Sequence, residues 1–297
     1  MIKKEALQKM VTEIMLKHIH TMIGLYKAKH PEEADKFIER LQKALETVHN
    51  ITLHPAKHKN GDPAPGGFYV VFLGYEWICK VSLHNHKLGK TASISKLAGS
   101  HCKHCKHCFK ECYVLKSYRL YKDKIAADFN NSVLFDLLEN FGYDAFIKAF
   151  AAWWKRRKRN TRFFRWDESG DLISVLEVLA QRQIALMFPG TRFYTYTKRK
   201  PLFEAYEEQK LMKRIDNYVI RFSPWLGDEE NNPATISGRR GCGYYVIDAD
   251  AETVKRTAES AGGVVCLCVG GNTKDACRRC GHACAYRNKA VFEQLNA

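Results

Sequence analysis

The sequence has no apolar stretch long enough to cross a lipid bilayer, since no run reaches the roughly 18 residues that a spanning helix needs. Its more apolar segments, such as residues 68–73, have the length of a single strand. Residues 1–5 lead into an amphipathic helical pattern and not into the apolar region of a secretion signal. We therefore expect a cytoplasmic protein that has no membrane partner.

Several common catalytic motifs are also missing. The chain contains no phosphate-binding loop of the form G-x-x-x-x-G-K-S/T, no G-x-S-x-G nucleophile elbow and no H-E-x-x-H pair. It also shows no internal repeat and no low-complexity tract. These absences exclude the usual NTPase, α/β-hydrolase and zinc-protease functions.

Acidic residues are scarce relative to basic ones, with 32 against 48, which gives a formal net charge of +16. This excess favours polyanionic partners such as nucleic acid or nucleotides. The densest basic run, WWKRRKR at 153–159, combines cations for phosphate contact with aromatic rings for base stacking. The candidate nucleic-acid-binding residues are Lys155, Arg156, Arg157 and Arg159. The alternative is a helix end whose cations suit the dipole while the tryptophans pack inward.

The chain has 11 cysteines, and in a reducing compartment these are metal ligands more often than disulfides. Residues 101–113 read HCKHCKHCFKECY, and the expected ligands are Cys102, Cys105, Cys108 and Cys112. Their spacing coincides with the ligand run of bacterial ferredoxins, so we expect an iron–sulfur cluster of the 4Fe–4S type. Zinc is the alternative, because four thiolates also suit tetrahedral zinc and His101, His104 and His107 could substitute as ligands. The interleaved histidines are expected beside the metal or on the surface, not as ligands.

A second cysteine group lies near the C-terminus, where residues 266–284 read CLCVGGNTKDACRRCGHAC. The expected ligands are Cys266, or Cys268 in its place, with Cys277, Cys280 and Cys284. A second iron–sulfur cluster and a structural zinc site both fit this spacing. Cys79 and Cys242 stand alone and are expected to be buried apolar residues.

The first 91 residues form two parts in this interpretation. Residues 1–53 are predicted to form a helical hairpin, with one helix over 2–26 and a second that begins at Pro31. His18 is expected at the margin of the first helix's apolar face, where a ligand role is not expected. Residues 54–91 comprise a linker rich in proline and glycine, followed by a hairpin of two strands at 68–73 and 77–83.

From residue 92 to residue 297 the pattern alternates between strand, loop and helix, which predicts one α/β metal-binding domain. Strands are expected at 92–97, 162–166, 192–197, 218–222, 243–247 and 264–267. Helices are expected at 114–128, 131–157, 172–187, 202–213 and 250–260. The fold class is therefore α/β with a parallel sheet, and closure into a partial or distorted (β/α) barrel fits this order.

Polar residues follow the second and third strands of this region, where side chains of an α/β fold reach the ligand face. The candidate cofactor-binding residues are Glu168, Ser169, Gly170, Asp171 and Lys198. The alternative is structural, with Ser169 or Asp171 capping the next helix and Lys198 in a solvated turn.

The order of these motifs resembles the gene product 88 family of phage and mobile-element proteins over roughly residues 92–297. The resemblance is carried by C-x-x-x-C-Y at 108–113, FRWDESGD at 164–171, FYTYTK at 193–198 and the C-terminal cysteines. It implies a distant similarity to radical S-adenosylmethionine proteins, which are partial α/β barrels. In such proteins a cluster loop follows the first strand, and a motif ending the second strand binds the amino group of S-adenosylmethionine.

Two functions from different classes follow. The first is an iron–sulfur protein of radical-enzyme-like architecture that binds a small cofactor or nucleotide near Glu168 and Asp171, and this class includes enzymes. The second is a zinc-stabilised basic protein that binds nucleic acid without catalysis. The cysteine-only ligand sets favour the first, and the charge favours the second.

Overall fold

The computed structural model describes residues 2–84, 88–102, 112–157, 162–207 and 213–223, together with a few short segments beyond residue 242. These later segments are 243–246, 252, 256, 259–260, 264–265 and 291–294. The chain forms two compact units. The first unit comprises Met1–Val81, Ile94–Arg159 and Asp167–Ile184, and the second comprises Ser82–Ser93, Asn160–Trp166 and Ala185–Ala297.

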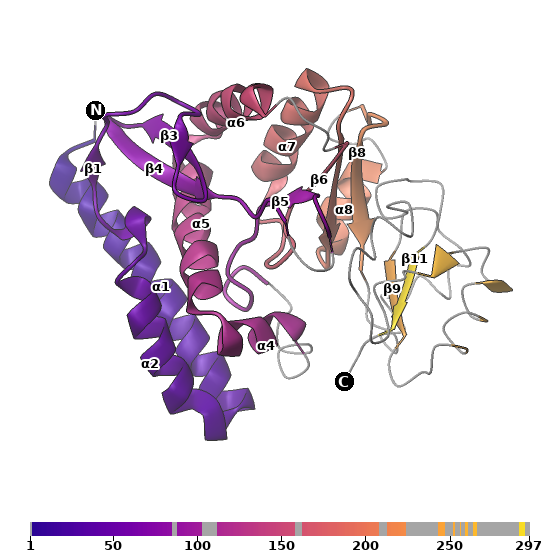
Figure 1. The fold of residues 1–297 in the computed structure, drawn as a ribbon, viewed down its shortest axis with the longest axis horizontal. Coiled ribbons are helices and arrows are strands. Elements are labelled where there is room, and N and C mark those ends of the chain that lie inside the picture. Colours follow the sequence, from indigo (N-terminus) through magenta and orange to yellow (C-terminus); the bar gives the residue numbers. More distant parts are fainter. Residues whose placement is uncertain are drawn as a thin grey trace. The chain divides into compact units, whose positions relative to one another are not determined.

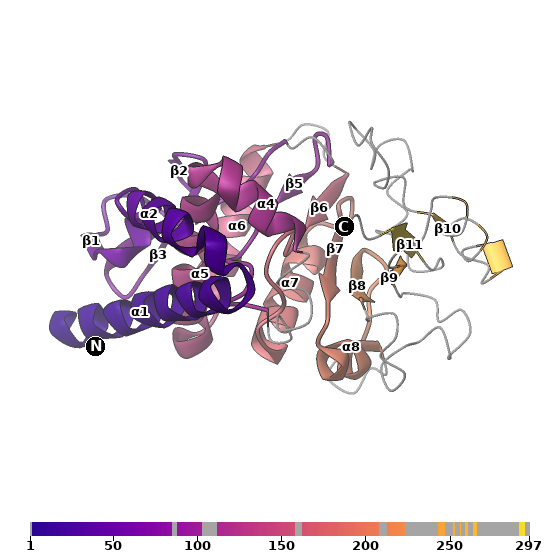
Figure 2. The ribbon, with the colours of Figure 1, turned by 90° about the horizontal axis from the view of Figure 1, so that it is seen from below.

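The predicted helical hairpin is confirmed at the N-terminus of the first unit. Helix α1 (Lys4–Lys29) is followed by a 3₁₀ turn (Pro31–Glu33) and by α2 (Ala34–Leu45), which lies beside α1 (Figures 1 and 2). Tyr26 of α1 stacks on Phe37 of α2 with ring centroids 3.6 Å apart. The margin position expected for His18 is wrong, because this side chain is fully buried. His18 continues the row of buried α1 residues at helical spacing, so it lies on the face of α1 that packs against other elements. Phe129 contacts its ring.

A four-stranded antiparallel sheet follows the hairpin, in the order β1-β4-β3-β2. The predicted hairpin is confirmed as β3 (Gly67–Phe72) and β4 (Tyr75–Lys80). The short strands β1 (His54–Pro55) and β2 (Pro63–Ala64) were not predicted. Both contain proline, which is tolerated in edge strands because it has no N–H to donate to a neighbour.

In the described residues, three helices come next in the first unit, where two were predicted. They are α4 (Tyr113–Leu120), α5 (Lys122–Phe141) and α6 (Asp144–Arg156). The predicted break near residue 130 is wrong and lies in the middle of α5, while the observed break is at Gly142. Gly142 has a φ of +89°, a conformation that ends a helix and that glycine adopts without steric strain.

Asparagines of α5 explain why a polar stretch continues as a helix. Asn130 and Asn131 are buried and hydrogen-bond to the half of β4 that β1 does not cover. The Asn130 amide donates to the carbonyl of Ile78, and the Asn131 amide both accepts from the N–H of Lys80 and donates to its carbonyl. The helix therefore satisfies a strand edge that has no neighbouring strand there.

The second unit contains the parallel sheet that the alternating pattern predicted, in the order β5-β6-β7-β8. Its strands are β5 (Ala92–Ser93), β6 (Phe163–Arg165), β7 (Arg192–Thr197) and β8 (Tyr218–Phe222). Helix α7 (Val175–Met187) precedes β7, and α8 (Lys200–Glu207) lies between β7 and β8 along the chain. The predicted bounds of the third and fourth strands are confirmed to the residue, whereas the first strand is shorter than expected.

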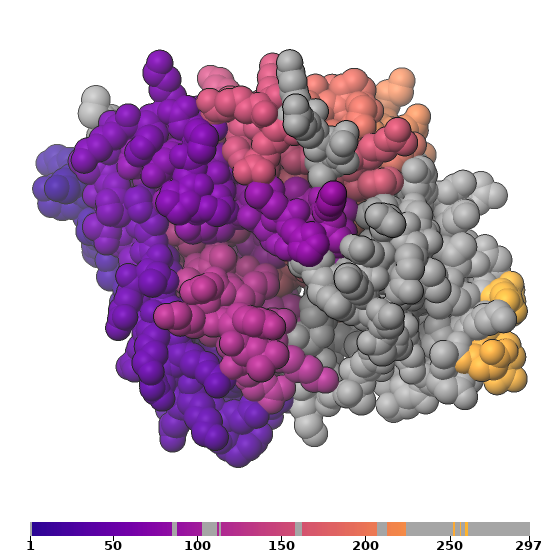
Figure 3. All heavy atoms as spheres, in the orientation of Figure 1, coloured from indigo at the N-terminus to yellow at the C-terminus, as the bar shows by residue number. Residues whose placement is uncertain are grey.

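A second parallel sheet is described further along the chain, in the order β10-β11-β9. It is formed by β9 (Gly243–Val246), β10 (Val264–Val265) and β11 (Val291–Gln294). The strand β11 was not predicted. The protein therefore has a mixed α/β fold with parallel strands. Figure 3 shows one face of the molecule, on which the indigo and violet atoms belong to the N-terminal part of the chain.

None of the helices in the described ranges combines the length and the apolar character that a bilayer span requires.

Candidate metal centre

Two cysteines of the first cluster are in the described part of the chain. Cys102 and Cys112 are both partly exposed, and neither forms a disulfide. Cys112 is the residue before the first turn of α4. Since a helix N-terminus stabilises negative charge, this position favours the thiolate form that binds metal. The following predicted site residues lie outside the described residues: Cys105, Cys108, Cys266, Cys277, Cys280, Cys284 and Arg159.

Both ends of the cysteine loop are attached to helix α5 through one tyrosine. The buried hydroxyl of Tyr118, on α4 after the loop, accepts a hydrogen bond from the N–H of Ala98, before the loop (3.0 Å). The same hydroxyl donates to the carboxylate of Asp128 on α5 (2.9 Å). The described segments on either side of residues 103–111 are therefore held together.

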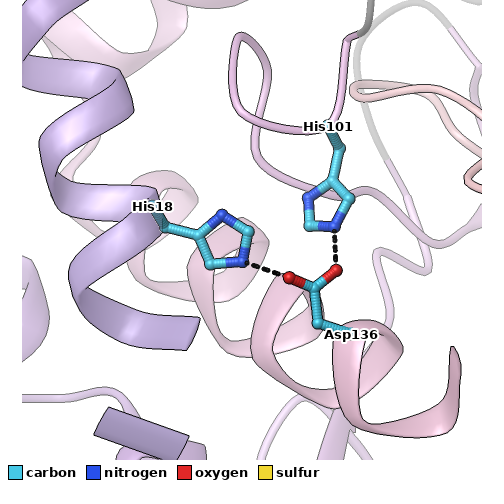
Figure 4. Close-up of side chains that lie close together, drawn as sticks. All are labelled: His18, His101 and Asp136. Atoms are coloured by element: carbon cyan, nitrogen blue, oxygen red, sulfur yellow. Dashed lines mark hydrogen bonds and ion pairs between the residues drawn. The ribbon is translucent and has the colours of Figure 1, made fainter. Parts of the chain in front are cut away.

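The start of the loop has further attachments to α5. The N–H of Leu97 donates to the hydroxyl of Ser132 (2.8 Å), and the ring of His101 lies 2.9 Å from a carboxylate oxygen of Asp136. Figure 4 shows that Asp136 also faces His18 of α1. Burial lowers the pKa of His101 to about 4, against the opposing effect of Asp136, so its ring is neutral at pH 7.

The segments that carry the cysteine loop and the ESGD motif lie side by side in the first unit. The N–H of Glu168 donates to the carbonyl of Ile94 (3.3 Å), and the N–H of Lys96 donates to the carbonyl of Ser169 (2.9 Å). These segments follow β5 and β6, which are parallel neighbours in their own sheet. Loops that leave parallel strands in the same direction meet at one edge, which explains the contact.

A buried lysine lies beneath the ESGD turn. Lys96 has no exposed side-chain surface, and its ammonium lies 2.8 Å from Asp167 and 2.5 Å from Glu177. Glu177 also accepts hydrogen bonds from the Gln181 amide and the N–H of Ile173. Burial acts to lower the pKa of Lys96, but the two carboxylates outweigh it and raise that pKa, so the lysine stays charged.

The turn approaches Lys96 so closely that one position requires glycine. Gly170 has a φ of +82°, and a Cβ added there would lie 2.8 Å from the Cβ of Lys96. Asp167, at the start of the turn, has a φ of +50°, which is uncommon outside glycine. The sequence ESGD therefore forms a tight turn whose shape depends on the ion pairs beneath it.

Asp128 joins this turn to the frame of the cysteine loop, which we define as the hydrogen-bonded residues Ala98, Tyr118 and Asp128. It accepts a hydrogen bond from the hydroxyl of Ser169 (2.7 Å) in addition to the one from Tyr118. The ammonium of Lys124 lies 2.8 Å from both of its oxygens. Burial raises the pKa of Asp128, although Lys124 and the hydroxyl donors oppose that rise.

The capping role considered for Ser169 and Asp171 is wrong. Ser174 caps α7, because its hydroxyl accepts from the N–H of Leu176 (3.0 Å). Asp171 is buried and accepts from the N–H of Leu172. Among the three carboxylates of residues 167–171, Glu168 alone is not buried, and so it is the acid most accessible to a ligand.

The other predicted site residues, Lys198 and the basic residues at the end of α6, do not take part in the contacts described above. The ammonium of Lys198, after β7, donates to the carbonyl of Ser223, after β8 (3.0 Å). Trp153 and Trp154 are buried, which confirms that the tryptophans of the basic run pack inward. The basic residues that follow them in the described range, Lys155, Arg156 and Arg157, are exposed. Arg156 hydrogen-bonds to Asp62, and Arg157 stacks on the ring of Trp153.

Sequence reasoning missed the residues that hold the two loops together. Lys96, Asp128 and Glu177 were not among the predicted site residues. A weak signal existed for Glu177, since S-V-L-E at 174–177 has the spacing of a capping box. No local pattern indicated Lys96, because its carboxylate partners lie far away in the sequence.

These features define an α/β protein whose first parallel strand leads into a cysteine loop and whose second leads into an acidic turn. A family model described as gene product 88 matches residues 74–286, which is more than half of the chain. The chain therefore belongs to the gene product 88 family, and the match begins before the expected start at residue 92. No curated protein and no solved structure matches the chain.

Proposed function

We propose that this protein binds an iron–sulfur cluster in the loop between Cys102 and Cys112. The observation that carries the proposal is the double attachment of this loop to α5 through Tyr118 and Asp128. A loop whose two ends are held together brings its first and last thiols toward one centre. The same spacing occurs in bacterial ferredoxins, where the first three cysteines of the run bind one 4Fe–4S cluster and the fourth binds a second cluster.

The described cysteines fit such a cluster. Neither Cys102 nor Cys112 forms a disulfide, so both thiols are available as metal ligands. The helix dipole of α4 favours negative charge at Cys112. When bound, the cluster supplies one-electron transfer, while the protein's own residues set its position.

The proposal extends to a small cofactor at the ESGD turn. A partial barrel of the radical S-adenosylmethionine type would place this turn beside the cluster loop, and the hydrogen bonds between residues 94–96 and 168–169 support that arrangement. Glu168 is the carboxylate best placed to accept an amine or a hydroxyl group, since Asp167 and Asp171 are buried. Lys96 and Asp128 act as positioning residues, because they hold the turn from below.

Anaerobic purification with iron and sulfide analysis tests the cluster. We expect a brown protein with thiolate-to-iron charge transfer, and we expect Cys105→Ser with Cys108→Ser to lose both colour and iron. Cys79→Ala is the control, because Cys79 is buried on β4 and should not affect the iron content. A colourless wild type that contains zinc in place of iron would refute the iron–sulfur assignment.

Isothermal titration of the cluster-replete protein with S-adenosylmethionine tests the cofactor. Glu168→Gln should weaken binding, because it removes the charge that pairs with the amino group. If the wild type with its full iron content shows no heat of binding, the cofactor part of the proposal is wrong and the cluster part remains.

Nucleic-acid binding is the second candidate function, and it is favoured by the exposure of Lys155, Arg156 and Arg157 at the end of α6. The buried tryptophans beside them remove the base-stacking part of that hypothesis. Binding of single-stranded RNA or DNA should then depend steeply on salt, and replacing these three residues by Ala should flatten that dependence. If the protein does not bind at low salt, this function is excluded.

A further inference from the structure

A second cluster of ligand-type side chains lies in the first unit, outside the cysteine set. His18 and His101 flank Asp136, with one ring facing each carboxylate oxygen (Figure 4). His101 Nε2 is 2.9 Å from Oδ1, and His18 Nε2 is 3.3 Å from Oδ2. All three ligand-atom positions lie within 4.8 Å of one another, and all three side chains are buried or nearly so.

These separations suit a shared metal ion. Around zinc, with bonds of about 2.0–2.2 Å to nitrogen and oxygen, neighbouring ligand atoms lie roughly 3.0–3.5 Å apart. The nitrogen–oxygen distances at both histidines are close to that range. A small shift of the rings would therefore be enough for an ion to enter between the nitrogens and the carboxylate.

The hydrogen bonding of His18 is incomplete in a way that an ion would correct. His18 is fully buried, yet its Nε2 has no hydrogen-bond partner within the described residues. This nitrogen faces Asp136 at 3.3 Å without the geometry of a hydrogen bond. Buried polar atoms without partners are destabilising, so each calls for an explanation such as a bound ion.

The other nitrogen of His18 is held by a group that favours ligation. His18 Nδ1 lies 2.5 Å from the hydroxyl of Ser100. When Nδ1–H donates to Ser100, the lone pair of Nε2 points toward the Asp136 carboxylate. Two lone pairs repel each other unless a proton or a metal ion lies between them, and a polar partner on the far nitrogen is the usual support of a ligand histidine.

We propose that His18 Nε2, His101 Nε2 and the Asp136 carboxylate bind one divalent transition-metal ion, with zinc as the best match. Imidazole and carboxylate ligands suit zinc, whereas an iron–sulfur cluster takes thiolates. Since His101 directly precedes Cys102, the ion ties α1, α5 and the start of the cysteine loop together. This site is independent of the cluster proposed for the loop. It reverses the expectations that neither His18 nor the interleaved histidines, of which His101 is one, act as ligands.

Zinc titration of the full chain tests the site. We expect His18→Gln and Asp136→Asn each to remove one equivalent of tightly bound zinc, with an affinity loss above about 100-fold, and Ser100→Ala to weaken binding about 10-fold. His20→Gln is the matched control, since His20 lies on the same helix with its side chain exposed. It should retain the full zinc content.

X-ray absorption of the zinc-loaded wild type gives a second measurement that does not depend on the folding of any variant. We expect a nitrogen and oxygen shell at about 2.0–2.1 Å with imidazole scattering, separate from any sulfur shell at about 2.3 Å. The nitrogen shell should be present even if the cysteine loop holds no metal. A wild type without imidazole scattering, or folded variants with unchanged zinc content, would overturn the proposal.

Discussion

Two buried polar clusters of the first unit differ in how their charges are balanced. In the lysine cluster, Lys96 supplies a positive charge to Asp167 and Glu177. In the histidine cluster, defined as His18, His101 and Asp136, one carboxylate faces two rings and, at 3.4 Å, the largely exposed ammonium of Lys17. The buried His18 Nε2 has no hydrogen-bond partner within the described residues. Burial of charge is common to both, whereas hydrogen bonding is more complete in the first.

This difference separates a structural cluster from a candidate ligand site. A buried ion pair that also receives backbone and amide hydrogen bonds positions its neighbours, and here it supports the ESGD turn. A buried group whose bonding is incomplete retains the capacity to bind an ion. The first cluster should therefore affect stability whether or not metal is present, and the second should respond to metal.

The largest effect is expected when the lysine cluster loses its cation. Lys96→Met leaves Asp167 and Glu177 buried without their counter-charge, and we expect a loss of about 3–5 kcal/mol in the free energy of unfolding. Denaturant titration measures this, with Lys116→Met, an exposed lysine on α4, as the control. Equal stability of the two variants would show that the lysine cluster does not support the fold.

Zinc should distinguish the two clusters. At zinc concentrations about 100 times the dissociation constant, binding to the native state stabilises it by about 2.7 kcal/mol. We expect Asp136→Asn to lose this part of the zinc-dependent rise in melting temperature, and Glu177→Gln, whose buried carboxylate faces Lys96 in the lysine cluster, to keep it. An equal zinc response in both variants would remove the distinction between the clusters.

Removing one hydroxyl tests the frame of the cysteine loop. Tyr118→Phe leaves the buried N–H of Ala98 without its acceptor, so we expect a loss of about 1–3 kcal/mol and a lower iron content. Tyr121→Phe is the control because the Tyr121 side chain is largely exposed. The frame is not needed for the cluster if Tyr118→Phe retains all its iron.

The smallest effect concerns a histidine that belongs to neither cluster. Burial, with His54 stacked on the ring, lowers the pKa of His49 to about 4. The folded state therefore favours the neutral ring, so the contribution of His49 is complete above about pH 6.5 and is lost as the pH falls toward 4.

Because His49 is half-exposed, we expect its contribution to be about 1 kcal/mol in that window. The pH dependence of unfolding in wild type and His49→Gln measures it. An identical acid dependence would mean that acid lability arises elsewhere, and the histidine cluster would be the first place to examine.

Predictability differed between strands, helices and sites for physical reasons. The strands β7 and β8 were predicted to the residue, because aromatic and β-branched runs between turn signals are local features. The ends of α5 were not, because Asn130 and Asn131 lie in mid-helix only by virtue of their bonds to β4. A polar stretch has the same local pattern whether it ends a helix or attaches to a strand edge.

In the candidate site, too, some features follow from the local sequence and others depend on contacts between distant residues. The cysteine spacing and the ESGD motif are local patterns, so their positions after two successive strands of the chain could be predicted from chain order. The part played by Tyr118 and Asp128 could not, since a tyrosine on one helix and an aspartate on the next have no pattern that marks them as partners.

The sequence alone therefore determined the α/β alternation, the helical hairpin, the family and the positions of the cysteine motifs. These depend on periodicity and spacing, which are properties of neighbouring residues. Only the tertiary structure decided that Lys96 lies under the acidic turn and that His18 meets His101 and Asp136. The environment of a buried ionisable group is set by whatever packs against it, and those partners come from distant parts of the chain.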